Sequence, residues 1–121
     1  MSNRERIDAA IQEYCRAMTA KDKTAWLALF SLSIRHQDPV GSPVNEGIEQ
    51  VAAFWDSVQP YDIDLRLKGT PIVRSNEAIA PMRAELGPSN ARRVMGDVYD
   101  HFIFDERVKI ISLRAFYDDV L

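Results

Sequence analysis

A carboxylic acid interrupts an otherwise apolar strand pattern near the C-terminus. In the segment 92–104, every second residue from Val94 to Phe104 is apolar or glycine except Asp100. An ionised carboxylate is costly on a face that points into a core. We therefore expect Asp100 either to be paired, with an arginine or at a sheet rim, or to keep its proton. A protonated carboxyl donates a hydrogen bond, and such donors stabilise an oxyanion that develops during a reaction.

Two other residues carry groups suited to the same chemistry. Asp38 precedes Pro39 at the start of a loop, where it is either a turn-forming residue or a carboxylate at a cavity mouth. Tyr14 lies within an apolar helical stripe, either as a core tyrosine with a satisfied hydroxyl or as a second donor. Together, the three residues describe a site: Asp38 on a loop at a cavity mouth, the Tyr14 hydroxyl from a helix, and Asp100 on an apolar strand face.

A histidine lies close to the first of these acids. His36 shares its strand parity with Asp38, so the two side chains could pair. The alternative is a surface histidine beside the turn, and we favour that alternative.

The elements that must position these residues begin with helices. Apolar residues recur at steps of three and four from Ile7 to Met18, which predicts a first helix. A second, short helix is expected after Asp22 and a third over 47–58. The second helix should bury Trp26, Leu29 and Phe30.

The remainder of the chain has the period of strands. After Pro60 apolar and polar residues alternate, which predicts strands over 63–67, 77–86, 92–104 and 109–117, in addition to a short extended segment over 34–38. This order predicts an α+β fold. Three N-terminal helices would pack on a curved, mainly antiparallel sheet that forms a cone-shaped barrel with an apolar pocket.

The strand expected over 77–86 has two unusual features. Pro81 has no N–H group, so this strand should lie at a sheet edge or carry a bulge. Ala78, Ala80 and Ala84 face one way, and their small side chains leave volume that a ligand could fill.

Composition limits the classes of function. The chain has 121 residues, which indicates a single domain over 1–121, and its net charge of −3 argues against nucleic-acid binding. A lone cysteine, Cys15, allows neither an intrachain disulfide nor an all-cysteine metal site. No apolar run approaches the roughly 18 residues of a membrane span, so we expect a cytoplasmic protein. The sequence has no glycine-rich phosphate loop and no Cys/His cluster, so neither a metal nor a cofactor is expected.

The candidate residues lie in motifs that resemble those of ketosteroid isomerases, within the nuclear transport factor-like (SnoaL-like) cone-fold superfamily. The resemblance runs over essentially the whole chain in order. It implies a cofactor-independent isomerase that moves the double bond of a 3-oxo-Δ5-steroid to the conjugated Δ4 ketone through a dienolate. The segments that carry it are Ile11-Gln12-Glu13-Tyr14, Asp38-Pro39-Val40-Gly41-Ser42, Phe54-Trp55, Pro81-Met82-Arg83-Ala84-Glu85, Asp100-His101-Phe102-Ile103-Phe104 and Ser112-Leu113-Arg114-Ala115-Phe116-Tyr117.

The resemblance also assigns roles to single residues. Asp38 would be the general base, Tyr14 an oxyanion donor and Asp100 a protonated oxyanion donor. A flat apolar wall would hold the steroid, unless its members are simply core residues. The candidates for this wall are Trp55, Met82, Val98, Phe102 and Tyr117.

The chain departs from the family at that wall. Ketosteroid isomerases commonly have Tyr where Trp55 stands, Phe where Met82 stands, and Phe or Trp where Tyr117 stands. Because an indole donates a hydrogen bond but cannot accept one, Trp55 cannot relay a hydrogen-bond chain to the oxyanion tyrosine.

Other functions on the same fold remain open at this point. A polyketide cyclase or a dehydratase would also use Asp, His and Tyr, and a His36–Asp38 pair would favour the dehydratase. A non-catalytic steroid-binding dimer module would gain nothing from Asp38. An epoxide hydrolase of this fold needs an Asp–Arg–Asp set, for which no arginine is available in the apolar interior.

A partner surface is also expected. The resemblance implies a homodimer, and exposed apolar side chains on the outer sheet face would suit one. The residues expected on that face are Tyr99, Ile103, Ile110 and Phe116, together with His101 and Arg114.

Overall fold

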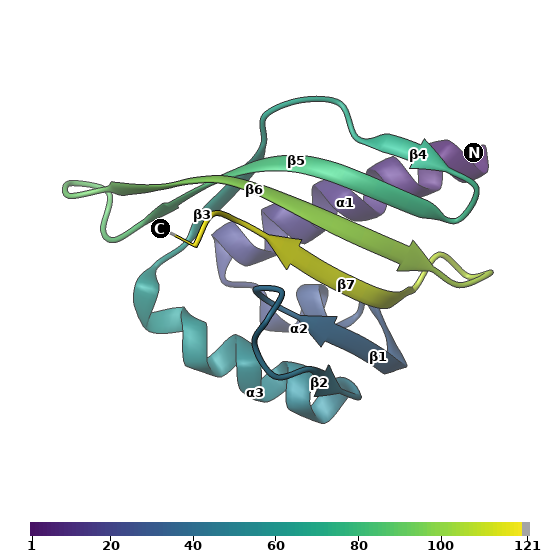
Figure 1. Cartoon of the computed structure of the whole chain (residues 1–121), viewed down its shortest axis with the longest axis horizontal. Coiled ribbons are helices and arrows are strands. Elements are labelled where there is room, and N and C mark those ends of the chain that lie inside the picture. Colours follow the sequence, from purple (N-terminus) through teal and green to yellow (C-terminus); the bar gives the residue numbers. More distant parts are fainter. Residues whose placement is uncertain (120–121) are drawn as a thin grey trace.

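The computed structural model describes residues 1–119, so the domain expected over 1–121 extends two residues beyond the described part. Within this part, three α-helices and a 3-10 turn pack against one face of a seven-stranded sheet (Figure 1). The helical elements are α1 (Asn3–Ala20), α2 (Lys23–Leu27), α3 (Ile48–Val58) and the 3-10 turn η1 (Gln59–Tyr61). The strands are β1 (Phe30–Gln37), β2 (Asn45–Glu46), β3 (Asp64–Leu67), β4 (Ile72–Arg74), β5 (Glu77–Leu86), β6 (Arg93–Phe104) and β7 (Ile110–Phe116).

The first helix forms where its caps and its apolar stripe predict. The Ser2 side chain accepts a hydrogen bond from the backbone N–H of Glu5, and the Glu5 carboxylate accepts one from the Ser2 backbone in return, which satisfies donors that a helix start leaves free. The helix ends at Lys21, whose backbone is left-handed. The stripe from Ile7 to Met18 is buried, and α1 runs behind the long strands in Figure 1.

The sheet is mixed and open. Its strand order is β2-β1-β7-β6-β5-β3, and β4 pairs with the remaining part of β5. The pairs are antiparallel except that β1 runs parallel to β7. The predicted α+β architecture with helices on one curved sheet is thus confirmed, but the sheet does not close into a barrel. β1 is also longer than expected and begins at Phe30, which was expected in the second helix.

Pro81 does not mark an edge strand. β5 pairs with β6 along its whole length and with β3 and β4 on its other side. Pro81 falls between those two short partners, where its carbonyl accepts a hydrogen bond from the backbone N–H of Lys68. At this position no partner strand needs a backbone N–H from β5. The proline is therefore tolerated although the strand lies inside the sheet.

Two bulges reverse the expected alternation. In β6, Gly96 pairs with Ala84 and Val94 with Glu85, so Met95 is an extra residue. It points inward while Val94 is 50% exposed. A similar irregularity separates the pairs Ile103–Ser112 and Phe104–Ile110. Ile110, expected on the outer face, is therefore fully buried.

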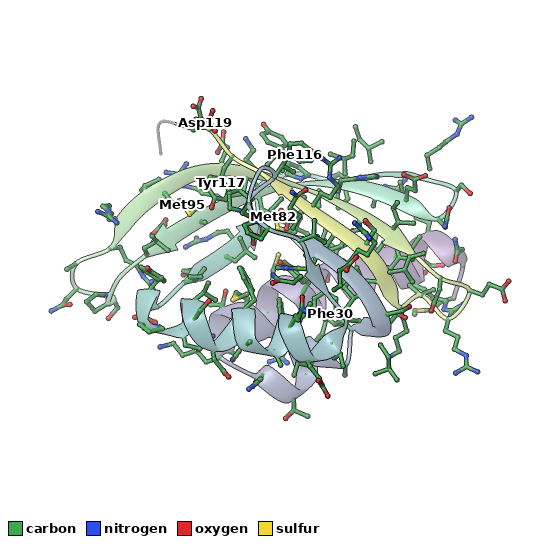
Figure 2. The ribbon with its side chains drawn as sticks, turned by 60° about the horizontal axis from the view of Figure 1, so that its bottom comes forward. Phe30, Met82, Met95, Phe116, Tyr117 and Asp119 are labelled. Carbon is green, nitrogen blue, oxygen red and sulfur yellow. The ribbon has the colours of Figure 1, made fainter. Side chains whose placement is uncertain are left out.

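The hydrophobic core lies between the helices and the inner face of the sheet. Figure 2 shows side chains filling this layer. Its largest fully buried members include Trp26, Phe102, Phe104 and Ile34. Within residues 1–119, no helix is both long enough and apolar enough to cross a membrane.

Candidate active site

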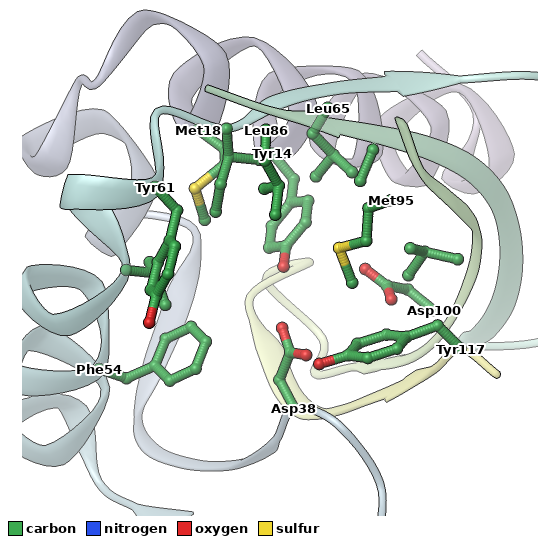
Figure 3. Close-up of a pocket in the computed structure, with 14 residues that line it drawn as sticks. Tyr14, Met18, Asp38, Phe54, Tyr61, Leu65, Leu86, Met95, Asp100 and Tyr117 are labelled. Carbon is green, nitrogen blue, oxygen red and sulfur yellow. The ribbon is translucent and has the colours of Figure 1, made fainter. Parts of the chain in front are cut away.

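A cavity of about 360 Å³ opens between the helices and the inner face of the sheet (Figure 3). Its lining is mostly apolar, and among the described residues that form it none is a lysine, an arginine or a histidine. The polar groups come from two aspartates and three tyrosines. The lining residues are Tyr14, Met18, Asp38, Phe54, Val58, Tyr61, Ile63, Leu65, Ala84, Leu86, Met95, Val98, Asp100 and Tyr117.

Asp100 reaches the cavity from the middle of β6. Its cross-strand neighbours are Ala80 on β5 and Ala115 on β7, so neither adjacent strand offers a polar partner. The residue is 2% exposed, and its Oδ1 atom is buried with no hydrogen-bond partner in the described structure. Burial, and to a lesser extent the charge of Asp38, raises the pKa of Asp100 well above its ordinary value. The raised pKa favours the protonated carboxyl, which can donate a hydrogen bond to a ligand.

Tyr14 is held by α1 and a wall of aromatic rings. Its ring makes edge contacts with Phe102 and Phe30, at centroid distances of 5.4 and 6.4 Å, and a tilted contact with Trp26 at 5.9 Å. The hydroxyl points into the cavity (Figure 3). Burial, then the charges of Asp100 and Asp38, raise the pKa of Tyr14 well above its ordinary value. The phenol thus stays protonated and is a second neutral donor.

Asp38 enters the cavity from the loop after β1. The backbone N–H of Val40 donates to the carbonyl of Ala115 over 2.8 Å, which ties this loop to β7. The Ser42 hydroxyl donates to the carbonyl of Pro39 over 2.6 Å and closes the turn. The Asp38 carboxyl points into the cavity (Figure 3), and burial raises its pKa to about 6. Most of this carboxyl is therefore ionised at pH 7, so Asp38 has the charge state of a base.

The residues expected to form the apolar wall divide into two groups. Val98 and Tyr117 line the cavity. Trp55, Met82 and Phe102 do not, and each is buried in the core instead. Trp55 packs on Trp26 with ring centroids 4.9 Å apart. The prediction that these three side chains point inward was correct, but they belong to the core: Phe102, for example, packs against the ring of Tyr14.

Most residues of the cavity wall were not predicted from the sequence. Phe54, Val58 and Tyr61 come from α3 and η1, which cover the cavity from the helical side (Figure 3). Met95 enters only because of the bulge in β6. The alternation of apolar and polar residues at Ile63 and Leu65 could have identified these two wall residues. Nothing in the local sequence distinguishes Met95 from its neighbours. The other unforeseen members are Met18 and Leu86.

His36 is not a surface residue and does not line the cavity. Its side chain is fully buried on the inner face of β1. The ring lies against Phe54 with centroids 4.5 Å apart, and Nδ1 is 3.2 Å from the Asn45 side-chain nitrogen. Burial lowers the pKa of His36 to about 4. The surface interpretation is corrected, since α3 covers this part of β1.

Within residues 1–119, no three or more His, Cys, Asp or Glu side chains are grouped so that they could hold a metal ion. Cys15 is buried, and its sulfur lies 3.8 Å from that of Met82. The groups available for chemistry in the cavity are therefore carboxyls and phenols.

A model of the SnoaL-like domain matches residues 11–113. The chain belongs to the SnoaL-like family. This family includes polyketide cyclases and isomerases and is commonly catalytic. The identification agrees with the helices and mixed sheet that surround the cavity.

Solved structures share the fold of this SnoaL-like domain. SalBIII, an epoxide hydrolase/cyclase-like enzyme with a role in pyran ring formation in the polyether salinomycin, is 21% identical with a TM-score of 0.86, over 99% of this chain and 96% of that chain. RV0760c from Mycobacterium tuberculosis is 17% identical with a TM-score of 0.84, over the same shares. A computationally designed 17-OHP binder is 22% identical with a TM-score of 0.80, over 93% of this chain and 90% of that chain. At these identities the likeness is one of fold.

Proposed function

We propose that this SnoaL-like domain is a cofactor-independent isomerase that converts a 3-oxo-Δ5-steroid into the conjugated Δ4 ketone. The observation that carries the proposal is that Asp38, Tyr14 and Asp100 meet in one apolar cavity (Figure 3). Burial raises the pKa of Asp38 only to about 6 and raises those of Tyr14 and Asp100 well above their ordinary values, which suits one base and two donors. A base with two donors is what proton transfer next to a ketone requires. A carboxylic acid kept neutral by an apolar site is a known device of the ketosteroid isomerases that the sequence resembles.

The proposed reaction has two proton transfers. Asp38 removes a proton from C4 of the steroid. The C4–H electron pair forms a C3=C4 double bond while the carbonyl π electrons move onto the C3 oxygen, which gives a dienolate. Tyr14 and Asp100 donate hydrogen bonds to that oxygen. Asp38 then returns the proton to C6, which leaves the double bond conjugated with the ketone and restores the carboxylate.

The surroundings of these groups strengthen each step. Hydrogen bonds to a developing charge are stronger in an apolar cavity than in water, and removing one such donor typically costs about 10²–10³ in rate. A positioned base contributes roughly 10²–10⁴. The cavity volume of about 360 Å³ lies near the lower end of the roughly 300–1,000 Å³ typical of small-molecule sites. Because none of the described lining residues is cationic, the site favours an uncharged ketone over a carboxylated substrate.

The structure argues against some of the alternative functions and not against others. A dehydratase built on a His36–Asp38 pair is disfavoured, because His36 lies behind Phe54 with its Nδ1 beside Asn45. A polyketide cyclase would also use a base and oxyanion donors, so it remains the alternative on this fold. A passive steroid carrier would not need a carboxylate that is ionised inside an apolar cavity.

The test is conversion of 5-androstene-3,17-dione, followed by the absorbance of the conjugated enone. We expect turnover by the wild type and a loss of about 10²–10⁴ in Asp38→Asn, because the amide cannot accept the proton. Asp56→Asn is the matched control, since Asp56 is an exposed carboxylate on α3 that pairs with Lys23. No turnover by the wild type would reject the steroid substrate. Wild-type turnover by Asp38→Asn would remove Asp38 from the base role.

A further inference from the structure

A second phenol lies beside Asp38 and has no part in the proposed reaction. β1 and β7 are parallel neighbours, with Gln37 opposite Arg114. The next residues, Asp38 and Ala115, therefore lie side by side, and the loop is tied to Ala115 by the Val40 N–H. Tyr117 follows Ala115 by two residues and so returns to the same, inner face of the sheet. The strand pairing thus brings Tyr117 close to Asp38.

The Tyr117 hydroxyl faces the Asp38 carboxyl across the cavity mouth. Figure 3 shows the phenol oxygen directed at the carboxyl, while Tyr61 lies on the opposite wall. The other titratable groups that face Asp38 are Tyr14 from α1 and Asp100 from β6. Both are already assigned to the substrate oxygen. Since no cation lines the cavity in the described structure, Tyr117 is the donor left for the base itself.

The electrostatics agree with a donor role. Burial, then the charge of Asp38, raises the pKa of Tyr117. The phenol therefore keeps its proton while Asp38 is ionised, as donation requires.

We propose that Tyr117 is a positioning residue, whose hydroxyl donates a hydrogen bond to the Asp38 carboxylate and holds it in place while the substrate proton is moved. No hydrogen bond joins the two side chains in this unliganded structure. Such contacts are often long in an unliganded site and tighten when a ligand binds. The base role of Asp38 rests on the proposed function, but the contact itself does not.

A donor to the charged form has a measurable consequence. It favours the carboxylate and so opposes the effect of burial on Asp38. Removing the hydroxyl should raise the titration midpoint of Asp38 by roughly one pH unit, as expected for a hydrogen bond to a charged group.

The test is a ¹³C NMR titration of the Asp38 carboxyl, assigned by the signal lost in Asp38→Asn. We compare wild type with Tyr117→Phe and Tyr61→Phe, which each lose one hydroxyl from the same cavity. The midpoint should rise in Tyr117→Phe and stay at the wild-type value in Tyr61→Phe. Tyr117→Trp retains an N–H donor and should remain closer to wild type than Tyr117→Phe does. An unchanged or lower midpoint in Tyr117→Phe, or an equal rise in Tyr61→Phe, would overturn the proposal.

A kinetic measurement distinguishes the loss of a hydrogen bond to Asp38 from a general structural defect in the variant. If Tyr117 acts through Asp38, the loss of kcat/KM in Tyr117→Phe relative to wild type should be close to tenfold larger near pH 5 than above pH 8. A purely structural defect would lower kcat/KM by one factor at every pH and would count against the proposal. If the wild type has no isomerase activity, the proposed function fails, and the NMR titration still decides the role of Tyr117.

Discussion

The properties of Asp100 follow from the two residues beside it. Alanines at positions 80 and 115 leave space around the carboxyl but provide no group to pair with it. A buried polar atom without a partner costs about 1–3 kcal/mol of stability, and the Oδ1 atom of Asp100 is in that position. Because Asp100 lowers the stability of the sheet, its presence is better explained by a hydrogen bond to a ligand oxygen.

The protonation of Asp100 predicts a pH-dependent effect of Asp100→Asn. In the unfolded chain Asp100 loses its proton near pH 4, whereas the raised pKa retains it in the folded state. Stability from this site is therefore complete below pH 4 and falls as the pH rises, by up to about 1.4 kcal/mol per unit, until the folded pKa is passed. Asn carries no titrating proton. The variant should thus gain stability relative to wild type between pH 5 and 8.

Urea denaturation at a series of pH values measures this effect. Asp38 and His36 titrate in both proteins, so their contributions largely cancel in the difference between the two unfolding free energies. A difference that does not change with pH would show that Asp100 is ionised in the folded protein.

The strands and the helix that covers them decide which side chains point inward. Alternation along β6 holds from Gly96 onward and fails at Met95, where the bulge adds a residue. On β1, the helix α3 covers the inner face and buries His36. The Nε2 atom of His36 has no partner in the described structure, so protonation would place an unpaired charge in an aromatic cluster.

The burial of His36 predicts a loss of stability in mild acid. Its folded pKa is lowered to about 4, while the unfolded value is about 6.5. Stability from this site is therefore complete above pH 6.5 and falls as the pH drops toward 4. His36→Phe removes this pH dependence. Below pH 6.5, the free energy of unfolding of the variant should therefore rise relative to that of wild type by up to about 1.4 kcal/mol per pH unit. Guanidinium denaturation of both proteins at pH 5 and 7.5 tests this prediction. If the difference between their unfolding free energies is the same at both pH values, His36 is not neutral and buried.

At the scale of the molecule, the helices cover one face of the sheet and leave the other uncovered. Three apolar side chains on neighbouring strands share that outer face: Ile79, Tyr99 and Phe116 are 48%, 44% and 42% exposed. An ion pair between Lys68 and Asp97 and a hydrogen bond between the side chains of His101 and Glu77 lie beside them. The homodimer implied by the resemblance would use this face, because apolar side chains gathered with paired charges suit a second copy of the chain.

This expectation is tested by the mass of the protein in solution. Wild type should sediment as a dimer, and Ile79→Glu should shift the population toward monomer, because burying an unpaired carboxylate in an interface is costly. Leu32→Glu is the control, since Leu32 is 79% exposed on β1, away from the centre of that face. A wild-type monomer at micromolar concentration would exclude this dimer.

The sequence alone predicted the order of the three helices and the long strands, and it singled out the three candidate residues, whose roles stay predictions. Helical and strand periods are local properties, so α1, α3 and the long strands could be predicted from neighbouring residues. Asp100 was visible because one acid broke an apolar alternation. The tertiary structure decided the rest: the parallel pairing of β1 with β7, the bulge at Met95, the cover of α3 over His36 and the placement of Tyr117 beside Asp38. Each of these depends on which distant segments meet, and pairing between residues far apart in the chain leaves little trace in the local pattern of either segment.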